Sequence, residues 1–203
     1  MISVLVTISA LISAVASVPY ILAVIRGTVR PRLVSWAVWA VLAGVMTVSA
    51  FAEGAMASAV MTLITFIACA TITILGWRRR SRDGMSRLDI VCLIGAAVGI
   101  ASLVAFKNPL IALGVSVAVD SIAFIPTLIH AWVSPHEESL ACFGLSATGG
   151  ILAVMAVIMG DISLAALLYP VYSMVFNSVA ALLIVGGRGK LLLGHQQYYG
   201  EEA

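Results

Sequence analysis

Charged side chains are scarce in this chain. Only 10% of its 203 residues are Asp, Glu, Lys or Arg, whereas 62% are hydrophobic, and the mean hydropathy is +1.14. A soluble domain of this size could not cover so much apolar surface with polar groups. The composition therefore excludes an ordinary soluble protein and indicates a protein built into a lipid bilayer.

Residues that carry enzymatic or metal chemistry are also few. The three cysteines, Cys69, Cys92 and Cys142, lie in separate apolar segments, and this spacing favours neither a disulfide nor a zinc site. The sequence contains no phosphate-binding glycine loop, nucleophile elbow or metalloprotease motif. We therefore expect no metal, no cofactor and no enzymatic activity.

What the chain does have is long apolar runs separated by short polar connections. A helix needs about 20 apolar residues to cross a hydrocarbon core of about 30 Å. Short connections make neighbouring helices antiparallel and leave no room for a soluble domain. We predict an all-α membrane protein with seven transmembrane helices. The predicted spans are residues 3–25, 33–52, 55–76, 88–106, 109–132, 139–159 and 162–186.

The basic residues predict an orientation. All Lys and Arg except Lys107 fall in the 1–2 loop, the 3–4 loop or the C-terminal tail. By the positive-inside rule, the N-terminus is outside and the C-terminus is cytoplasmic in a multi-pass protein of the plasma (inner) membrane. The run from Arg78 to Arg82 is interpreted as a topology determinant beside anionic lipid headgroups, so no nucleic-acid partner is expected.

Landmarks in the first half of the chain recur in the second half. Pro19 and Pro126 lie 107 residues apart, each late in an apolar run and each followed by a polar turn. Another Pro and then a Ser follow in both halves, at Pro31 and Ser35 and at Pro135 and Ser139. Internal duplication in a membrane protein favours a carrier, because two similar halves can rock around a shared midplane site.

The repeat predicts a 3+1+3 layout of parallel three-helix bundles. The first repeat covers residues 1–77, a basic loop and linker helix cover 78–107, the second repeat covers 108–187, and a cytoplasmic tail covers 188–203. The odd helix lets both bundles keep the same orientation, related by an axis along the membrane normal.

The proline segments resemble a known motif. Val18-Pro19-Tyr20 and Ile125-Pro126-Thr127 look like two copies of the PQ-loop, with Tyr20 and Thr127 where the motif has Gln. Together with the layout, this makes the whole chain similar to the SWEET/PQ-loop superfamily of seven-helix membrane carriers. The resemblance implies transport of a small polar solute, such as a sugar, an amino acid or a vitamin, by alternating access. Related folds serve as sorting receptors, so the solute does not follow from the fold.

Polar residues at helical spacing within the spans are candidates for a solute path. Ser9, Ser13 and Ser17 share one face of span 1, and alignment of the prolines matches Ser13 to Asp120 and Ser9 to Ser116 in span 5. Further stripes occur in span 3, at Ser58, Thr62, Thr65 and Cys69, and in span 7, at Tyr169, Ser173 and Asn177. The alternative is that Ser and Thr only bond preceding carbonyls or join helices.

Asp120 is the one ionisable residue deep inside a predicted span. Its charged form costs about 2.5–3.5 kcal/mol at a helix centre, so it should face the bundle interior or water. It either stays protonated or is ionised against donors such as Ser116, Ser121 or Asn177. We interpret Asp120 as a proton-coupling site or a substrate hydrogen-bond acceptor, with a neutral structural acid as the alternative.

Other candidate residues follow from the resemblance and from side-chain chemistry. Asn177 offers donors and an acceptor at mid-span, and sugar-carrying SWEETs are similar in having an Asn on the third helix of each repeat. Proton-coupled amino-acid carriers of the PQ-loop group have an Asp in the sixth span, where Ser146 stands here. Trp39 is either a pocket wall or a plain packing residue.

Two prolines are candidates for hinges. A Pro within a helix removes a backbone hydrogen bond and bends the helix. Pro19 and Pro126 are therefore either paired hinges near a cytoplasmic gate or fixed kinks that shape the bundle.

The sequence favours a membrane transporter whose partners are the lipid bilayer, a small-molecule solute and, in one arrangement, a second copy of the chain. Coupling to protons through Asp120 is part of this hypothesis. The rival hypothesis is a membrane receptor or sorting protein that binds a ligand without moving it.

Overall fold

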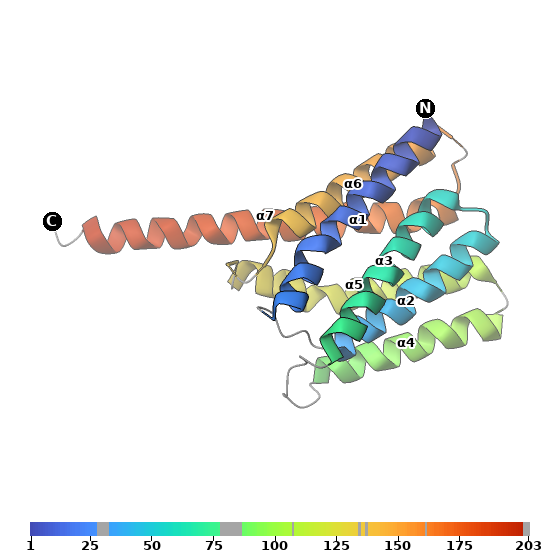
Figure 1. The fold of residues 1–203 in the computed structure, drawn as a ribbon, viewed down its shortest axis with the longest axis horizontal. Helices are drawn as coiled ribbons and strands as arrows, with labels where there is room; N and C mark the ends of the chain where they lie inside the picture. Colours follow the sequence, from blue (N-terminus) through green and yellow to red (C-terminus); the bar gives the residue numbers. More distant parts are fainter. Residues whose placement is uncertain are drawn as a thin grey trace.

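The computed structural model describes residues 1–27, 33–77, 87–106, 108–133, 135–136, 138–160 and 162–200, and the long elements among them are α-helices (Figure 1). They are α1 (Ile2–Arg26), α2 (Leu33–Ala52), α3 (Met56–Gly76), α4 (Arg87–Phe106), α5 (Pro109–Val133), α6 (Leu140–Ile158) and α7 (Leu164–Gly200). Their boundaries match the predicted spans closely, except at the end of α7.

Glycines end the first two helices. Gly27 follows α1 in the left-handed region, with φ of 76°. After α2, Gly54 has φ of 67°, and the amides of Gly54 and Ala55 bond back to the carbonyls of Phe51 and Ala50. This pair of bonds is a Schellman motif, which satisfies carbonyls at the helix end. The result is a tight turn that returns the chain into α3.

Polar side chains cap the N-termini of α5, α6 and α7. Asn108 accepts hydrogen bonds from the amides of Leu110 and Ile111, and Pro109 occupies the first helical position, where its missing N–H costs nothing. Ser139 accepts from the amide of Cys142 at the start of α6, and Ser163 does the same for α7. These caps fix where α5, α6 and α7 begin.

Helix α7 runs 37 residues to Gly200 and projects beyond the other helices (Figure 1). The predicted span ended at residue 186, and a cytoplasmic tail was predicted from residue 188. Instead, Gly187 lets α7 pass the carbonyl of Trp132, and the Arg188 guanidinium donates to the carbonyls of Pro135 and Glu138. The region predicted as a cytoplasmic tail is therefore helical through Gly200.

Five helices are long enough and apolar enough to cross a membrane: α1, α3, α5, α6 and the part of α7 up to Lys190. In α2 and α4 the apolar stretches that the described residues provide are shorter, Trp36–Ala52 and Leu93–Ser102. The all-α membrane class is therefore supported, and the count of seven spans stays a prediction.

The apolar side chains that face outward form continuous stripes. On α1, residues three or four apart are all at least 40% exposed, which places them on one helical face. Water would solvate such a surface poorly, whereas lipid tails cover it without cost. These residues are Val4, Ile8, Leu11, Val15, Val18, Leu22 and Ile25.

The helices contact one another in a regular pattern. Helix α3 packs against both α1 and α2, and α7 packs against both α5 and α6. The two groups meet where α1 contacts α6, α2 contacts α5 and α3 contacts α7, while α4 lies against α5 and α2. The N-terminus and the turn between α2 and α3 lie at one end of the assembly, and the C-terminal part of α7 projects from the other (Figure 1).

Small residues make the tightest of these contacts. A Cβ at Gly149 would lie 2.5 Å from Oγ of Ser13 on α1, and a Cβ at Gly150 would lie 2.5 Å from the backbone nitrogen of Met174 on α7. Many buried core residues are alanines. Small residues let helix backbones approach closely, which is how helices associate within a bilayer.

Replacement of Gly150 by Ala should destabilise the protein, because the new methyl group meets the α7 backbone. We expect a loss of about 1–3 kcal/mol, as for other overpacked sites. Gly144→Ala on the same helix is the matched control, since nothing lies within 4 Å of its Cβ position. Thermal unfolding in detergent measures both. Equal melting temperatures for the two variants would contradict the close α6–α7 contact.

Candidate functional site

The polar stripes predicted on spans 3 and 7 face each other. Thr65 on α3 and the hydroxyl of Tyr169 on α7 share a hydrogen bond of 2.8 Å. One turn from the start of α3, Ser58 donates to the carbonyls of Ala165 and Ala166, at 2.9 and 2.8 Å. The interface between α3 and α7 therefore contains polar contacts along its length.

Most hydroxyl groups in the helices bond to their own backbone. Thr47, Thr62 and Thr73 donate to carbonyls three or four residues earlier, at 2.7 to 3.1 Å. For these three residues the structure agrees with the alternative interpretation, in which a Ser or Thr hydroxyl only bonds a preceding carbonyl of its own helix. A hydroxyl satisfied in this way has little capacity left for a solute.

Asp120 lies on the inner face of α5 and is only 9% exposed. The hydroxyl of Tyr172 on α7 lies close to its carboxyl group. Cys69 on α3 and Tyr169 on α7 lie near enough to interact with its charge. The carboxyl is therefore positioned where α5, α7 and α3 converge, as its cost in lipid requires.

Two of the three donors expected for Asp120 have other partners. Ser121 donates to the carbonyl of Val117 at 2.7 Å, and Asn177 donates to the carbonyl of Ser173 at 2.8 Å. Oγ of Ser116 is buried and has no hydrogen-bond partner among the described residues. The structure therefore uses the hydroxyl of Ser121 and one N–H of Asn177 for carbonyls of their own helices, and pairing of Asp120 with these donors stays a prediction.

Sequence reasoning missed an aromatic cluster beside the carboxyl. The ring of Tyr172 lies 5.0 Å from that of Phe176, 5.7 Å from that of Tyr169 and 6.4 Å from that of Phe124. Two signals were available: Phe124 follows Asp120 by four residues, and Tyr172 follows Tyr169 by three, so each pair shares a helical face. We call Asp120, Phe124, Tyr169, Tyr172 and Phe176 the central cluster.

Ser146 and Ser173 meet at the contact between α6 and α7. Oγ of Ser173 donates to the carbonyl of Ser146 at 3.4 Å, so Ser146 takes part through its backbone. Nδ2 of Asn177 lies 3.5 Å from Oγ of Ser173 and extends the polar line on α7. Ser173 and Asn177 therefore extend a line of polar side chains along α7, from the central cluster toward the projecting end of the helix.

Ser13 lies apart from its counterpart Asp120. It faces Gly149 on α6, and its Oγ is buried with no hydrogen-bond partner among the described residues. Its neighbour Ser9 donates to the carbonyl of Gly149 at 2.8 Å. Ser13 and Asp120 therefore have different surroundings, and the stripe on α1 serves the contact with α6.

Trp39 belongs to a second aromatic group. Its ring lies 5.3 Å from that of Trp36, which in turn lies 4.6 Å from the ring of Tyr20 on α1. Tyr20, which follows Pro19, therefore makes an aromatic contact between α1 and α2. This group favours the packing interpretation of Trp39.

The two predicted hinges, Pro19 and Pro126, lie within the ranges of α1 and α5. Pro19 lies inside α1, which continues as one helix through it. Pro126 lies within the helical range of α5, but its side chain is outside the described part of the structure. Whether either proline moves stays a prediction.

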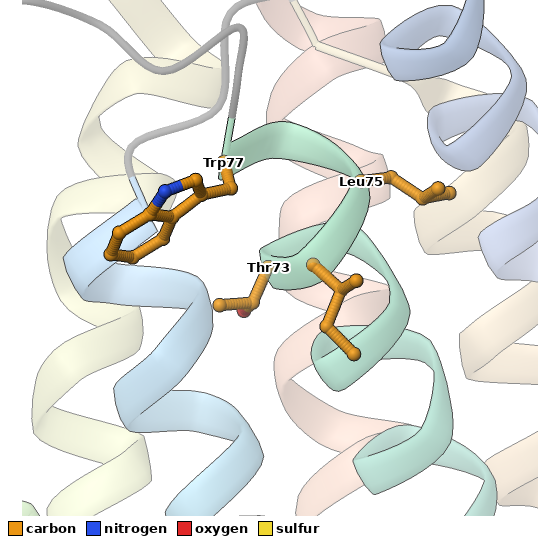
Figure 2. Close-up of a pocket in the computed structure, with 4 residues that line it drawn as sticks. Thr73, Leu75 and Trp77 are labelled. Carbon is orange, nitrogen blue, oxygen red and sulfur yellow. The ribbon is translucent and has the colours of Figure 1, made fainter.

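A surface pocket at the end of α3 is separate from the central cluster. It is lined by Thr73, Ile74, Leu75 and Trp77, and Figure 2 shows Leu75 and Trp77 pointing to opposite sides of the helix. Trp77 is 62% exposed, as expected for an aromatic residue at a membrane interface. The described residues contain no group of three His, Cys, Asp or Glu side chains that could hold a metal ion.

The hydrogen bond between Thr65 and Tyr169 should couple the two central helices. A double-mutant cycle of Thr65→Val and Tyr169→Phe should give a coupling free energy of about 0.6 kcal/mol, and at most about 1.7 kcal/mol. Thr73→Val with Tyr169→Phe is the control cycle, because Thr73 donates to Cys69 on its own helix. Unfolding in mixed micelles measures both cycles, and equal couplings would contradict the contact.

Comparison of the chain with protein-family models, with curated proteins and with solved structures found no match. The similarity to SWEET/PQ-loop carriers therefore rests on the repeat spacing and motif positions in this sequence, and it stays a prediction.

Proposed function

We propose that this protein is a membrane transporter that moves a small polar solute by alternating access. The observation that carries the proposal is the central cluster, in which a buried carboxyl on α5 faces tyrosines on α7, with Thr65 and Cys69 of α3 beside them. A charged group is costly in the membrane and usually marks a substrate or ion pathway. No enzymatic activity is proposed.

The helix contacts support two three-helix bundles, α1–α3 and α5–α7, with α4 as the linker. In each bundle the third helix contacts the other two, and exchange of the bundles maps the contact of α1 with α6 onto that of α5 with α2. Ser58 bonds to Ala165, which follows it by 107 residues, the same offset as between Pro19 and Pro126. This supports a SWEET-like 3+1+3 arrangement in which both halves contribute to one midplane site.

Asp120 is the proposed coupling group. Its proton affinity depends on hydration, because removal from water disfavours the charged carboxylate. Rocking of the bundles would change that hydration, which links proton binding to the side from which the site is open. The solute is a sugar, an amino acid or a vitamin-like molecule in this proposal.

One observation favours a receptor as the second candidate. Helix α7 continues beyond the bundle to Gly200, where it could present a docking surface on the predicted cytoplasmic side. A receptor of this fold would bind its ligand at the central cluster without moving it.

Uptake into proteoliposomes tests the transporter proposal. A panel of sugars, amino acids and vitamins is offered with and without an inward proton gradient. Asp120→Asn should lower gradient-driven uptake by about tenfold or more, equivalent to about 1.4 kcal/mol. Ser121→Ala is the control, since Ser121 bonds to the backbone of Val117. Unchanged uptake and pH dependence in Asp120→Asn would exclude coupling, and ligand binding without uptake would favour the receptor.

Cysteine labelling tests the proposed orientation. In a cysteine-free background, Glu53→Cys and Asn108→Cys should react with an impermeant maleimide on intact cells, because both exposed positions fall on the predicted outer side. His136→Cys, exposed in the connection between α5 and α6, should react only after permeabilisation. The reverse pattern would invert the topology, and labelling of all three on intact cells would contradict the span assignment.

A further inference from the structure

The central cluster combines one carboxyl group with several aromatic faces. Asp120 and Phe124 share a face of α5, and Tyr172 and Phe176 lie opposite on α7. Tyr172 contacts three rings, and its hydroxyl also reaches the carboxyl. Aromatic faces carry a partial negative charge, so rings and carboxylate together form an environment that attracts a cation.

The described residues place no positive side chain against Asp120. Of the helices packed against α5, α2 has no charged residue, and the basic residues of α7 all lie beyond Gly187. The charged residues of α4, Arg87 and Asp89, lie in its first turn, with side chains outside the described part. A buried carboxylate without a countercharge is costly, and a bound cation would supply it.

We propose that the central cluster binds a positively charged ammonium group, so that the solute class is small organic amines rather than uncharged sugars. This inference rests on the proposed function, because it names the solute of the same site. The ammonium group lies against the carboxyl of Asp120 and the ring face of Tyr172. The amide of Asn177 and the hydroxyl of Ser173, further along α7, remain for polar groups on the rest of the solute.

The amine site differs from a site for proton coupling alone, because it requires a ligand that carries a fixed positive charge. A proton alone neutralises Asp120 and needs no aromatic ring. An organic cation uses both, since its charge meets the carboxylate while its carbon atoms contact the rings. Ligands that differ only in charge therefore test the site directly.

The experiment measures binding of two matched pairs to the purified protein by isothermal titration in detergent. Choline is compared with its uncharged carbon isostere dimethylbutanol, and phenethylamine is compared with phenethyl alcohol. At least one cation should bind about tenfold more tightly than its isostere or better, a difference equivalent to about 1.4 kcal/mol. Asp120→Asn should remove this preference, and Ser121→Ala should retain it.

Two variants of Tyr172 separate the ring from the hydroxyl. Tyr172→Phe keeps the aromatic face and should retain most of the cation preference, whereas Tyr172→Leu should lose it. The melting temperature of each variant is measured beforehand, so that a folding defect is recognised. Equal binding of cations and isosteres by the wild type, or full cation binding by Asp120→Asn, would overturn the proposal.

Uptake of the same compounds distinguishes this inference from the transporter proposal. Saturable uptake of an uncharged solute, with no preference for cations in binding, refutes the amine site and leaves transport intact. Cation binding that depends on Asp120, with no uptake of any solute, supports the amine site and refutes transport.

Discussion

The structure depends on the inability of lipid to form hydrogen bonds. Polar groups in the hydrocarbon core must find partners within the protein, and helices satisfy their backbone groups internally. The hydroxyl side chains follow the same rule, since most bond to carbonyls of their own helix. The few that bond across helices, such as Ser9 to Gly149 and Ser58 to Ala165, mark the contacts that define which helices are neighbours.

The same constraint explains where the unusual groups lie. Outward faces carry mainly apolar side chains, and exposed hydroxyls such as those of Thr7 and Thr148 bond to carbonyls of their own helix. A carboxyl such as Asp120 has no such local partner and is tolerated only in the protein interior, where helices converge. Small residues bring the backbones close enough for such convergence, as Gly149 and Gly150 do for α1 and α7. The tyrosines of α7 then surround the carboxyl, because they share the face that α7 turns toward α5.

Hydropathy and end signals predicted most of the fold. The helix boundaries agreed to within a few residues, since the length of each apolar run is a local feature of the sequence. The continuation of α7 as a helix to Gly200 was not predicted, and the contacts of Gly187 and Arg188 with the connection between α5 and α6 are tertiary.

The candidate site was predicted only in part. Asp120 was evident because a charge within an apolar run has few explanations. Its partner was not, because Tyr172 becomes its neighbour only when α5 packs against α7. Ser13 matched Asp120 in the repeat, yet its surroundings differ, since repeat position says nothing of which neighbours each bundle provides.

The bond between Ser58 and Ala165 has a mechanical consequence for a protein that rocks as proposed. It ties the two central helices together about one turn from where each begins, and α3 extends about 30 Å from there. Such a tie acts as a fulcrum, so that a small tilt at this end becomes the largest separation at the far end. The bond between Thr65 and Tyr169, about halfway along α3, would have to break before the far end separates.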